Sequence, residues 1–191
     1  YGTSLVLGTN NTGATRYTTS GLISSDTVTA VVLNQNSNTT VPATQAASAY
    51  TGPTNGILVG NASGSGLGNY TISYVPATLT INQKALTISG QTASNKVYDA
   101  GTIATLNSGS ASLVGVVNGD SVSLNTSGAY GTFASANVAN TIAVTVGGNA
   151  LSGTAASNYS IVQPTGLTAN ITQAPLTVTA RVDAKFVTYS D

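Results

Sequence analysis

The stretch Thr78–Leu79–Thr80–Ile81–Asn82–Gln83 decides the fold, because it alternates apolar and polar residues and its end returns later in the chain. Alternation places Leu79 and Ile81 on one face of a strand and the threonine hydroxyls on the other. The second copy ends in Ile171–Thr172–Gln173, 90 residues further on (171 − 81). A repeat at this distance predicts tandem structural units.

The sequence on both sides of this stretch repeats as well. Upstream, Asn69–Tyr70 returns as Asn158–Tyr159, 89 residues later (158 − 69). Downstream, the alternating run Ala85–Leu86–Thr87–Ile88 returns as Pro175–Leu176–Thr177–Val178. Two units of about 90 residues lie within the usual size range of domains.

These repeats predict three segments. Residues 1–84 form a first β-rich repeat that lacks its opening strand, residues 85–174 form a second repeat, and residues 175–191 form the opening strand of a third. Tyr1, Tyr98 and Tyr189 stand at the opening of each unit. Because almost no linker separates one unit from the next, we expect the units to follow one another directly.

Short runs rich in β-branched residues, with a turn signal every eight to twelve residues or so, predict an all-β fold with little or no helix. We expect tandem β-sandwich or β-grasp-like repeats that form an elongated rod. The expected strands include residues 27–33, 114–117, 121–124, 130–133 and 141–146, and a turn is expected at Gly52–Gly56.

The composition excludes several classes of function. Only 5% of the residues are charged and the net charge is zero, so nucleic acid is not an expected partner. The absence of Cys and His removes the common nucleophiles, bases and metal ligands, so we expect neither an enzyme nor a cofactor. No apolar run approaches the roughly 20 residues of a membrane span, so no membrane insertion is expected.

Asp26 and Asp120 occupy matching positions in the repeat, in front of Thr27–Val28 and Ser121–Val122. A repeated Asp in a turn is a weak candidate for Ca²⁺, which prefers six to eight oxygen ligands. The ordinary interpretation is a turn capped by the side chain. Asp99 lies close to Lys96 and is expected to form a local ion pair or strand-end cap.

Tyr70 and Tyr159 recur at the same position of each unit. A platform on which a sugar stacks is one interpretation, although such a site needs several aromatic rings and the chain has no Trp. The interpretation we favour is structural: the ring packs at the edge of the core and the hydroxyl finds a partner at the rim.

Several motifs resemble a known family. The segments Lys96–Gly101, Asn118–Val122, Ala156–Tyr159 and Ile171–Val178 resemble the YDG-type repeat, and residues 1–84 resemble the MBG-type repeat that often accompanies it. Such repeats occur in bacterial filamentous-haemagglutinin-like surface adhesins. The tripeptide that names the family is altered here, because Tyr98–Asp99 is followed by Ala100–Gly101. The resemblance implies an extracellular location and a stalk or adhesive role, and it supplies no catalytic residues.

The predicted function is a structural repeat module of a secreted bacterial cell-surface adhesin, acting as a stalk or spacer in adhesion or biofilm. One alternative is a subunit of an extracellular fibre or sheath assembled by β-strand complementation. Another is a carbohydrate-binding module. The expected partners are neighbouring repeats or identical subunits placed head to tail, with host or matrix glycans or proteins as further candidates.

Overall fold

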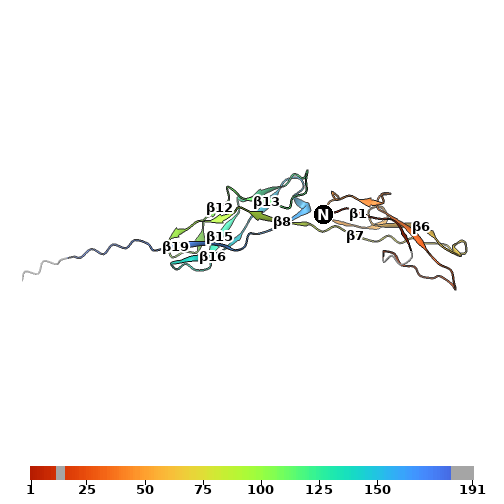
Figure 1. Ribbon diagram of the computed structural model, residues 1–191, viewed down its shortest axis with the longest axis horizontal. Helices are drawn as coiled ribbons and strands as arrows, with labels where there is room; N and C mark the ends of the chain where they lie inside the picture. The colour runs from red at the N-terminus through yellow and green to blue at the C-terminus, as the bar shows by residue number, and fades with distance from the viewer. Residues whose placement is uncertain (12–15, 182–191) are drawn as a thin grey trace, which may run out of the picture.

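The computed structural model describes residues 1–11 and 16–181, and it confirms the all-β class. The strands form two sets that lie one after the other along the long axis, with the N-terminus between them (Figure 1). We call residues 1–83 the first unit and residues 84–172 the second unit. The described strands belong to seven separate small sheets, so they do not form a clear, continuous rod.

The first unit is built from short antiparallel pairs. Its main sheet has the order β2–β3–β6, and β1–β4 and β5–β7 are two-stranded. One helical turn, α1 (Gly52–Asn55), lies where the sequence predicts a turn, and η1 (Leu67–Asn69) is a 3₁₀ turn. The strands are β1 (Leu5–Val6), β2 (Gly8–Asn11), β3 (Ala30–Asn34), β4 (Thr40–Val41), β5 (Ala49–Tyr50), β6 (Leu58–Ser63) and β7 (Leu79–Thr80).

The second unit contains a five-stranded sheet of order β10–β19–β16–β15–β11 and a three-stranded sheet of order β13–β8–β18. The pairs β9–β12 and β14–β17 complete it. Its strands are β8 (Lys84–Ser89), β9 (Thr92–Ala93), β10 (Lys96–Val97), β11 (Ile103–Ala104), β12 (Leu106–Asn107), β13 (Ser112–Val114), β14 (Ser123–Asn125), β15 (Tyr130–Phe133), β16 (Ala139–Gly147), β17 (Ala150–Ser152), β18 (Tyr159–Val162) and β19 (Leu167–Thr172); η2 (Ala156–Asn158) is a 3₁₀ turn.

Each unit has its own core. In β16 the alternation of the sequence buries Ile142, Val144 and Val146 on one face. These side chains pack with Phe133 of β15 and with residues of β19, and the β9–β12 pair lies against them. The core of the first unit is separate and consists of Leu7, Val31, Leu33 and Val41, with partly buried neighbours from β6 and β7. The described part of the chain thus has two separate clusters of buried apolar residues, one in each unit.

Four predicted strands differ in their bounds from the observed ones, and β16 is the one that extends beyond the predicted residues 141–146 at both ends. β3 begins at Ala30, not at residue 27, although the N–H groups of Thr27 and Thr29 still donate to the carbonyls of Ser65 and Ser63. β13 ends at Val114, because Gly115 takes a φ of +101° and turns the chain. β14 covers residues 123–125, since the carbonyl of Ser121 accepts a hydrogen bond from Ala155 instead of joining the sheet.

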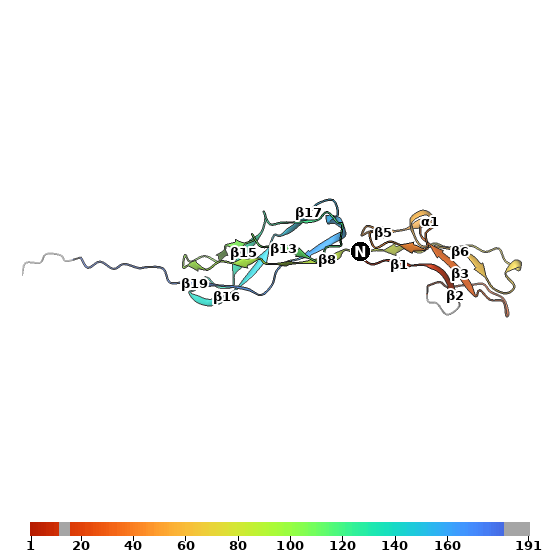
Figure 2. The same cartoon turned by 45° about the horizontal axis from the view of Figure 1, so that its top comes forward.

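The segment after β19 leaves the second unit in extended form, and the two views agree that it points away from the first unit (Figures 1 and 2). Residues 173–181 belong to no sheet of the described chain. Tyr189 and the rest of residues 182–191 lie outside the described residues, so the opening of a third unit stays a prediction. Among the described helices, none has the length and apolar character that crossing a membrane requires.

Candidate functional site: the joint between the two units

A hydrogen-bonded corner stands at one end of the first unit. The hydroxyl of Tyr70 donates to Asp26 Oδ2 at 2.8 Å and accepts from the N–H of Ile23 at 2.9 Å. The turn itself closes with the N–H of Asp26 donating to the carbonyl of Ile23 at 3.2 Å. One tyrosine thus holds both ends of the turn, and Asp26 is the acceptor that orients it.

The second unit builds the same corner from the matching residues. The hydroxyl of Tyr159 donates to Asp120 Oδ2 and accepts from the N–H of Val117 at 2.9 Å. The N–H of Asp120 donates to the carbonyl of Val117 at 3.1 Å. In both units the tyrosine therefore bonds an aspartate and the residue three positions before it. The corner is a repeated structural device.

A glycine and a 3₁₀ turn precede each tyrosine. Gly64 stands six residues before Tyr70, and Gly153 stands six residues before Tyr159. The three residues directly before each tyrosine form the 3₁₀ turn, η1 in the first unit and η2 in the second. Gly153 has a φ of +105°, and a Cβ there would lie 2.5 Å from the carbonyl oxygen of Ser121. Only glycine allows so close an approach, so the loop that contains Gly153 can lie directly against Ser121, next to the turn that Tyr159 holds.

Tyr1 joins the two units at the corner of the second one. Its hydroxyl donates to Asp120 Oδ2 at 2.8 Å, so this carboxylate accepts from Tyr1 and Tyr159 together. The two rings meet edge to face, with centroids 5.3 Å apart and planes at 76°. The Tyr1 nitrogen donates to the carbonyl of Asn82 at 2.8 Å, which ties Tyr1 to the last residues of its own unit.

Further hydrogen bonds cross the joint around η2. The N–H of Ala47 donates to Asn158 Oδ1 at 2.9 Å, and Gln83 Nε2 donates to the carbonyl of Ser157 at 2.9 Å. Gly2 takes a φ of +86°, and a Cβ there would lie 3.0 Å from Val117 of the second unit. The joint therefore combines the packing of the Tyr1 and Tyr159 rings with the carboxylate of Asp120 as a charged acceptor. The side chains of Gln83 and Asn158 add hydrogen bonds across it.

The environment of the shared carboxylate changes the acidity of both tyrosines. Burial, followed by the hydrogen bond to Asp120, raises the pKa of Tyr159 to about 12. The hydrogen bond to Asp120 and then burial raise the pKa of Tyr1 above its ordinary value. Both hydroxyls therefore keep their protons at neutral pH and act as donors to the carboxylate.

The opposite end of the second unit carries the equivalent of Tyr1. The N–H of Tyr98 donates to the carbonyl of Thr172 at 2.8 Å, as the Tyr1 nitrogen does to Asn82. Tyr98 is 41% exposed, and its hydroxyl makes no hydrogen bond with the described residues. Each unit therefore has an acceptor end, with the aspartate corner, and a donor end, with an opening tyrosine.

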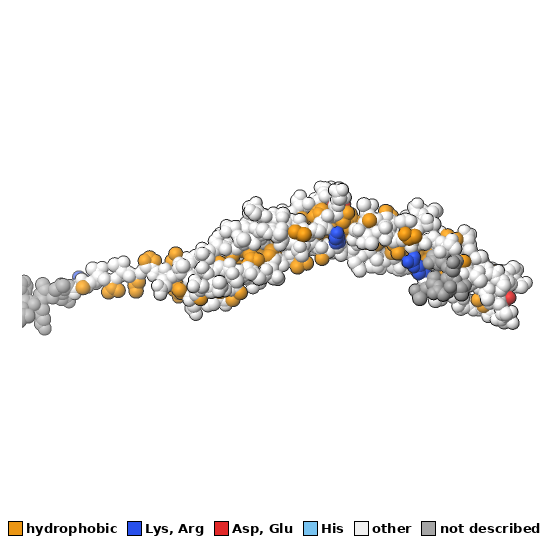
Figure 3. Space-filling model, viewed as in Figure 1, with side chains coloured by type: hydrophobic (Ala, Val, Ile, Leu, Met, Phe, Trp, Pro, Cys, Tyr) orange, Lys and Arg blue, Asp and Glu red, His pale blue; other side chains and the backbone are white. Residues whose placement is uncertain are grey.

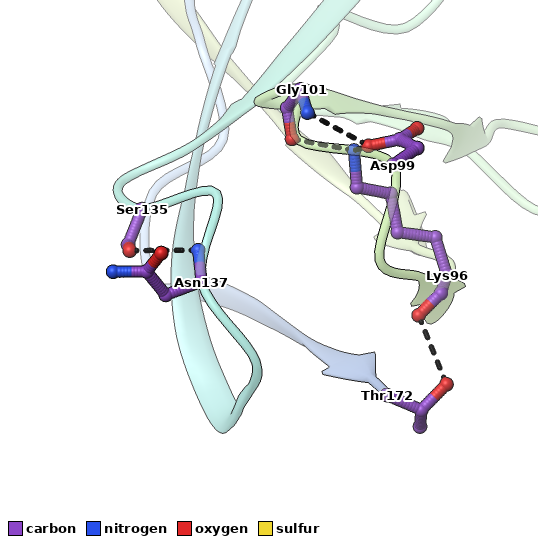
Figure 4. Close-up of polar contacts among 6 residues, drawn as sticks. All are labelled: Lys96, Asp99, Gly101, Ser135, Asn137 and Thr172. Carbon is purple, nitrogen blue, oxygen red and sulfur yellow. Dashed lines mark hydrogen bonds and ion pairs between the residues drawn. The ribbon is translucent and has the colours of Figure 1, made fainter. Parts of the chain in front are cut away.

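Lys96 and Asp99 shape this donor end (Figure 4). Lys96 Nζ lies 2.7 Å from Asp99 Oδ1 and donates to the carbonyl of Gly101 at 2.7 Å. Its Nζ also lies 5.6 Å from the ring centroid of Phe133. The bond from Lys96, followed by the N–H of Gly101, lowers the pKa of Asp99. The pair fixes the turn that follows Tyr98.

Sequence reasoning singled out most residues of the joint but not their pairing. It expected Asp26 and Asp120 to cap their own turns, whereas their carboxylates accept tyrosine hydroxyls. Among the described residues no group of three or more acidic, His or Cys side chains is placed to hold a metal ion. The joint roles of Ala47, Gln83 and Asn158 were missed. The recurrence of Asp and Tyr at matching positions was the available signal.

The comparisons with known proteins concern mainly the second unit. Residues 82–166 match the YDG domain family. No curated protein and no solved structure matches the chain. The match begins two residues before β8 and covers the Asp120–Tyr159 corner, and it ends before β19.

This match corrects the resemblance stated from the sequence. The finding is one YDG domain at residues 82–166, less than half of the chain. It does not support YDG-type and MBG-type tandem repeats of filamentous-haemagglutinin-like adhesins over nearly the whole chain. That wider assignment was therefore wrong, and the structural likeness of the two units stands on their own contacts.

Proposed function

We propose that the chain is a structural spacer module of a secreted cell-surface protein, in which β-rich units follow one another and lock end to end. The observation that carries the proposal is the shared carboxylate of Asp120, which accepts one hydroxyl from each unit. A spacer keeps the parts of a protein at its two ends a fixed distance apart, so its joints must resist bending.

The connection between the units supports this role. β7 ends at Thr80 and β8 begins at Lys84, so only residues 81–83 separate the two strands. Two of these three residues also take part in the joint, since Asn82 accepts from Tyr1 and Gln83 donates to Ser157. A connection this short, with its own hydrogen bonds, leaves little freedom for one unit to swing against the other.

The composition supports a location outside the cell. The chain has no Cys and no Met, so it lacks the side chains that oxidants modify most readily. Its surface polarity comes mainly from neutral Thr, Ser and Asn, because only ten residues are charged. Labelling of intact source cells with an antibody to this chain tests the location, and labelling only after lysis would overturn it.

Stiffness of the joint is measured by spin labels on cysteines introduced at the exposed residues Thr54 and Thr165, one in each unit. The native chain has no Cys, so only these two positions react. The proposal predicts one narrow distance distribution at low protein concentration, and a broader one in the Tyr1→Phe variant. A broad distribution in the unsubstituted chain would mean that the units move independently, against a spacer role.

A further inference from the structure

The second unit contains a pocket of about 500 Å³ that takes no part in the joint. It lies beside β11, the edge strand of the five-stranded sheet, and β15, the strand next to it. The turn that leads into β15 closes the pocket, with the N–H of Ala129 donating to the carbonyl of Thr126 at 3.0 Å. All its lining residues fall within residues 103–108 and 126–132, and none belongs to the aspartate corner or to the donor end of the unit.

Tyr130 lines the pocket with an aromatic ring that is held in place. β15 alternates, so Tyr130 and Thr132 face solvent while Gly131 and Phe133 face the core. Tyr130 pairs with Gly147 across the sheet, and a Cβ at Gly147 would lie 2.6 Å from Cζ of the ring. The ring thus lies directly over a glycine, which leaves room for it, and yet Tyr130 is 61% exposed. An exposed aromatic ring in a fixed position provides a platform for stacking.

Ile103 adds a second apolar surface to the pocket. It pairs with Thr132 across β11 and β15, and it is 81% exposed. β11 is only two residues long, and beyond it the N–H of Ser94 already donates to the carbonyl of Thr105 at 2.9 Å. An edge this short offers little backbone for an added strand. The exposed apolar side chains therefore fit a small ligand better than a peptide strand.

Hydroxyl groups line much of the remaining pocket. Those of Thr105, Thr126 and Thr132 make no hydrogen bond with the described residues. Ser108 Oγ accepts from Nε2 of the buried Gln91 at 2.8 Å. This bond holds the oxygen of Ser108 in place and leaves its O–H available as a donor. The pocket therefore offers several hydroxyls to a polar ligand.

The pocket carries no charge, since none of its lining residues is acidic or basic. Away from the joint, the face of the second unit in the space-filling view shows hydrophobic and neutral side chains and no charged one (Figure 3). Phosphate and carboxylate groups are bound mainly through charged donors, which this pocket lacks. The lining fits a neutral ligand that has both an apolar face and many hydroxyls, and sugar rings have this combination.

We propose that this pocket binds a neutral oligosaccharide, with one sugar ring stacked on Tyr130 and sugar hydroxyls bonded to those of the threonines and Ser108. The volume lies within the range of small-ligand sites. A single aromatic platform gives weak binding, with a dissociation constant on the order of 1 mM. The site differs from the sugar platform considered at Tyr70 and Tyr159, whose hydroxyls hold the two corners. It goes beyond the spacer role and does not depend on it.

Titration of the full chain with neutral trisaccharides of glucose, xylose, mannose, galactose and N-acetylglucosamine tests the proposal. At concentrations above the expected dissociation constant, at least one of them should shift the amide resonances of residues 103–108 and 126–132. The resonances of Asp120 and Tyr159 at the joint should stay in place. Trigalacturonate, which carries carboxylates, is the matched probe and should cause no shift. No shift with any neutral trisaccharide, or shifts centred on other residues, would overturn the proposal.

Substitutions in the pocket provide a second measurement. Tyr130→Ala should weaken binding of the trisaccharide at least about fivefold, whereas Tyr130→Phe keeps the ring and should stay within about twofold. Thr132→Val removes a hydroxyl but leaves the ring in place, and it should weaken binding about threefold. Tyr74→Ala is the matched control, because Tyr74 is an exposed tyrosine of the first unit, and it should leave binding unchanged.

Native affinity in both Tyr130→Ala and Thr132→Val would overturn the proposal. A peptide of alternating Val and Thr distinguishes the other occupant of an edge. If this peptide shifts the resonances of residues 103–108 and no trisaccharide does, the pocket binds a strand and the proposal is wrong. Because these readouts concern ligand binding within one unit, they are independent of the spin-label distances that test the joint.

Discussion

The hydroxyl of Tyr1 donates to Asp120 Oδ2 at 2.8 Å, across 119 residues of sequence. The same carboxylate holds Tyr159 within the second unit. Asp120 therefore has two tasks, closing a corner and receiving the neighbouring unit, whereas Asp26 at the matching corner is bonded to Tyr70 alone among the described tyrosines. The following predictions separate these two tasks and test the corner itself.

Asp120→Ala should lower the free energy of unfolding of the second unit by about 2–3 kcal/mol, because a buried tyrosine hydroxyl loses a charged acceptor. Urea unfolding followed by tyrosine fluorescence measures it. Asp26→Ala is the matched control: it should destabilise only the first unit and leave the spin-label distances across the joint unchanged. Equal effects of both substitutions on those distances would contradict the assigned role of Asp120.

Gly153→Ala should destabilise the second unit by more than about 1 kcal/mol, since the added Cβ meets the carbonyl of Ser121 in addition to the strain of a positive φ. Thermal unfolding measures the change. Gly166→Ala is the control, because Gly166 has a φ of +77° but no atom within 4 Å of the new Cβ. If both variants lose the same stability, close approach of the loop is not the reason for glycine at position 153.

High pH should weaken the corner of the second unit. The pKa of Tyr159 rises from its ordinary value of 10.0 to about 12 in the folded chain, chiefly through burial. The folded state thus holds this proton more tightly than the unfolded state. The resulting stabilisation is complete below pH 10 and is lost as the pH rises through 12.

Unfolding measured between pH 9 and about 12.5 should show this loss in the native chain, and a smaller loss in Tyr159→Phe. Tyr130, for which no hydrogen bond to an acidic side chain is present among the described contacts, provides the control substitution. Identical pH profiles for the native chain and Tyr159→Phe would contradict the assignment of the lost stability to ionisation of Tyr159.

A buried amide cluster should stabilise the second unit independently of the joint. Asn149, which is 5% exposed, donates to Gln91 Oε1 at 3.0 Å and to Gln163 Oε1 at 2.9 Å. Asn149→Ala leaves both acceptors without this partner and should cost about 2–4 kcal/mol in the free energy of unfolding. The joint distances should not change. A cost below about 0.5 kcal/mol would indicate that water replaces the amide.

The strands were predicted where burial follows the alternation of the sequence. β15 and most of β16 were expected, because every second residue of Ile142–Val146 is apolar and one face of the sheet is buried. Strand ends were predicted less well, since they depend on neighbouring segments, as where the N–H of Ala155 donates to the carbonyl of Ser121 ahead of β14. Those neighbours are distant in sequence, and local patterns do not contain them.

The sequence by itself determined the all-β class, the repeated unit of about 90 residues and the recurrence of Asp and Tyr, because periodicity and repeats are local or self-similar properties. Only the tertiary structure decided that the recurring Asp and Tyr bond each other and that Tyr1 shares the carboxylate of Asp120. These contacts join residues 39 to 119 positions apart, and the folded path of the chain alone sets which side chains meet.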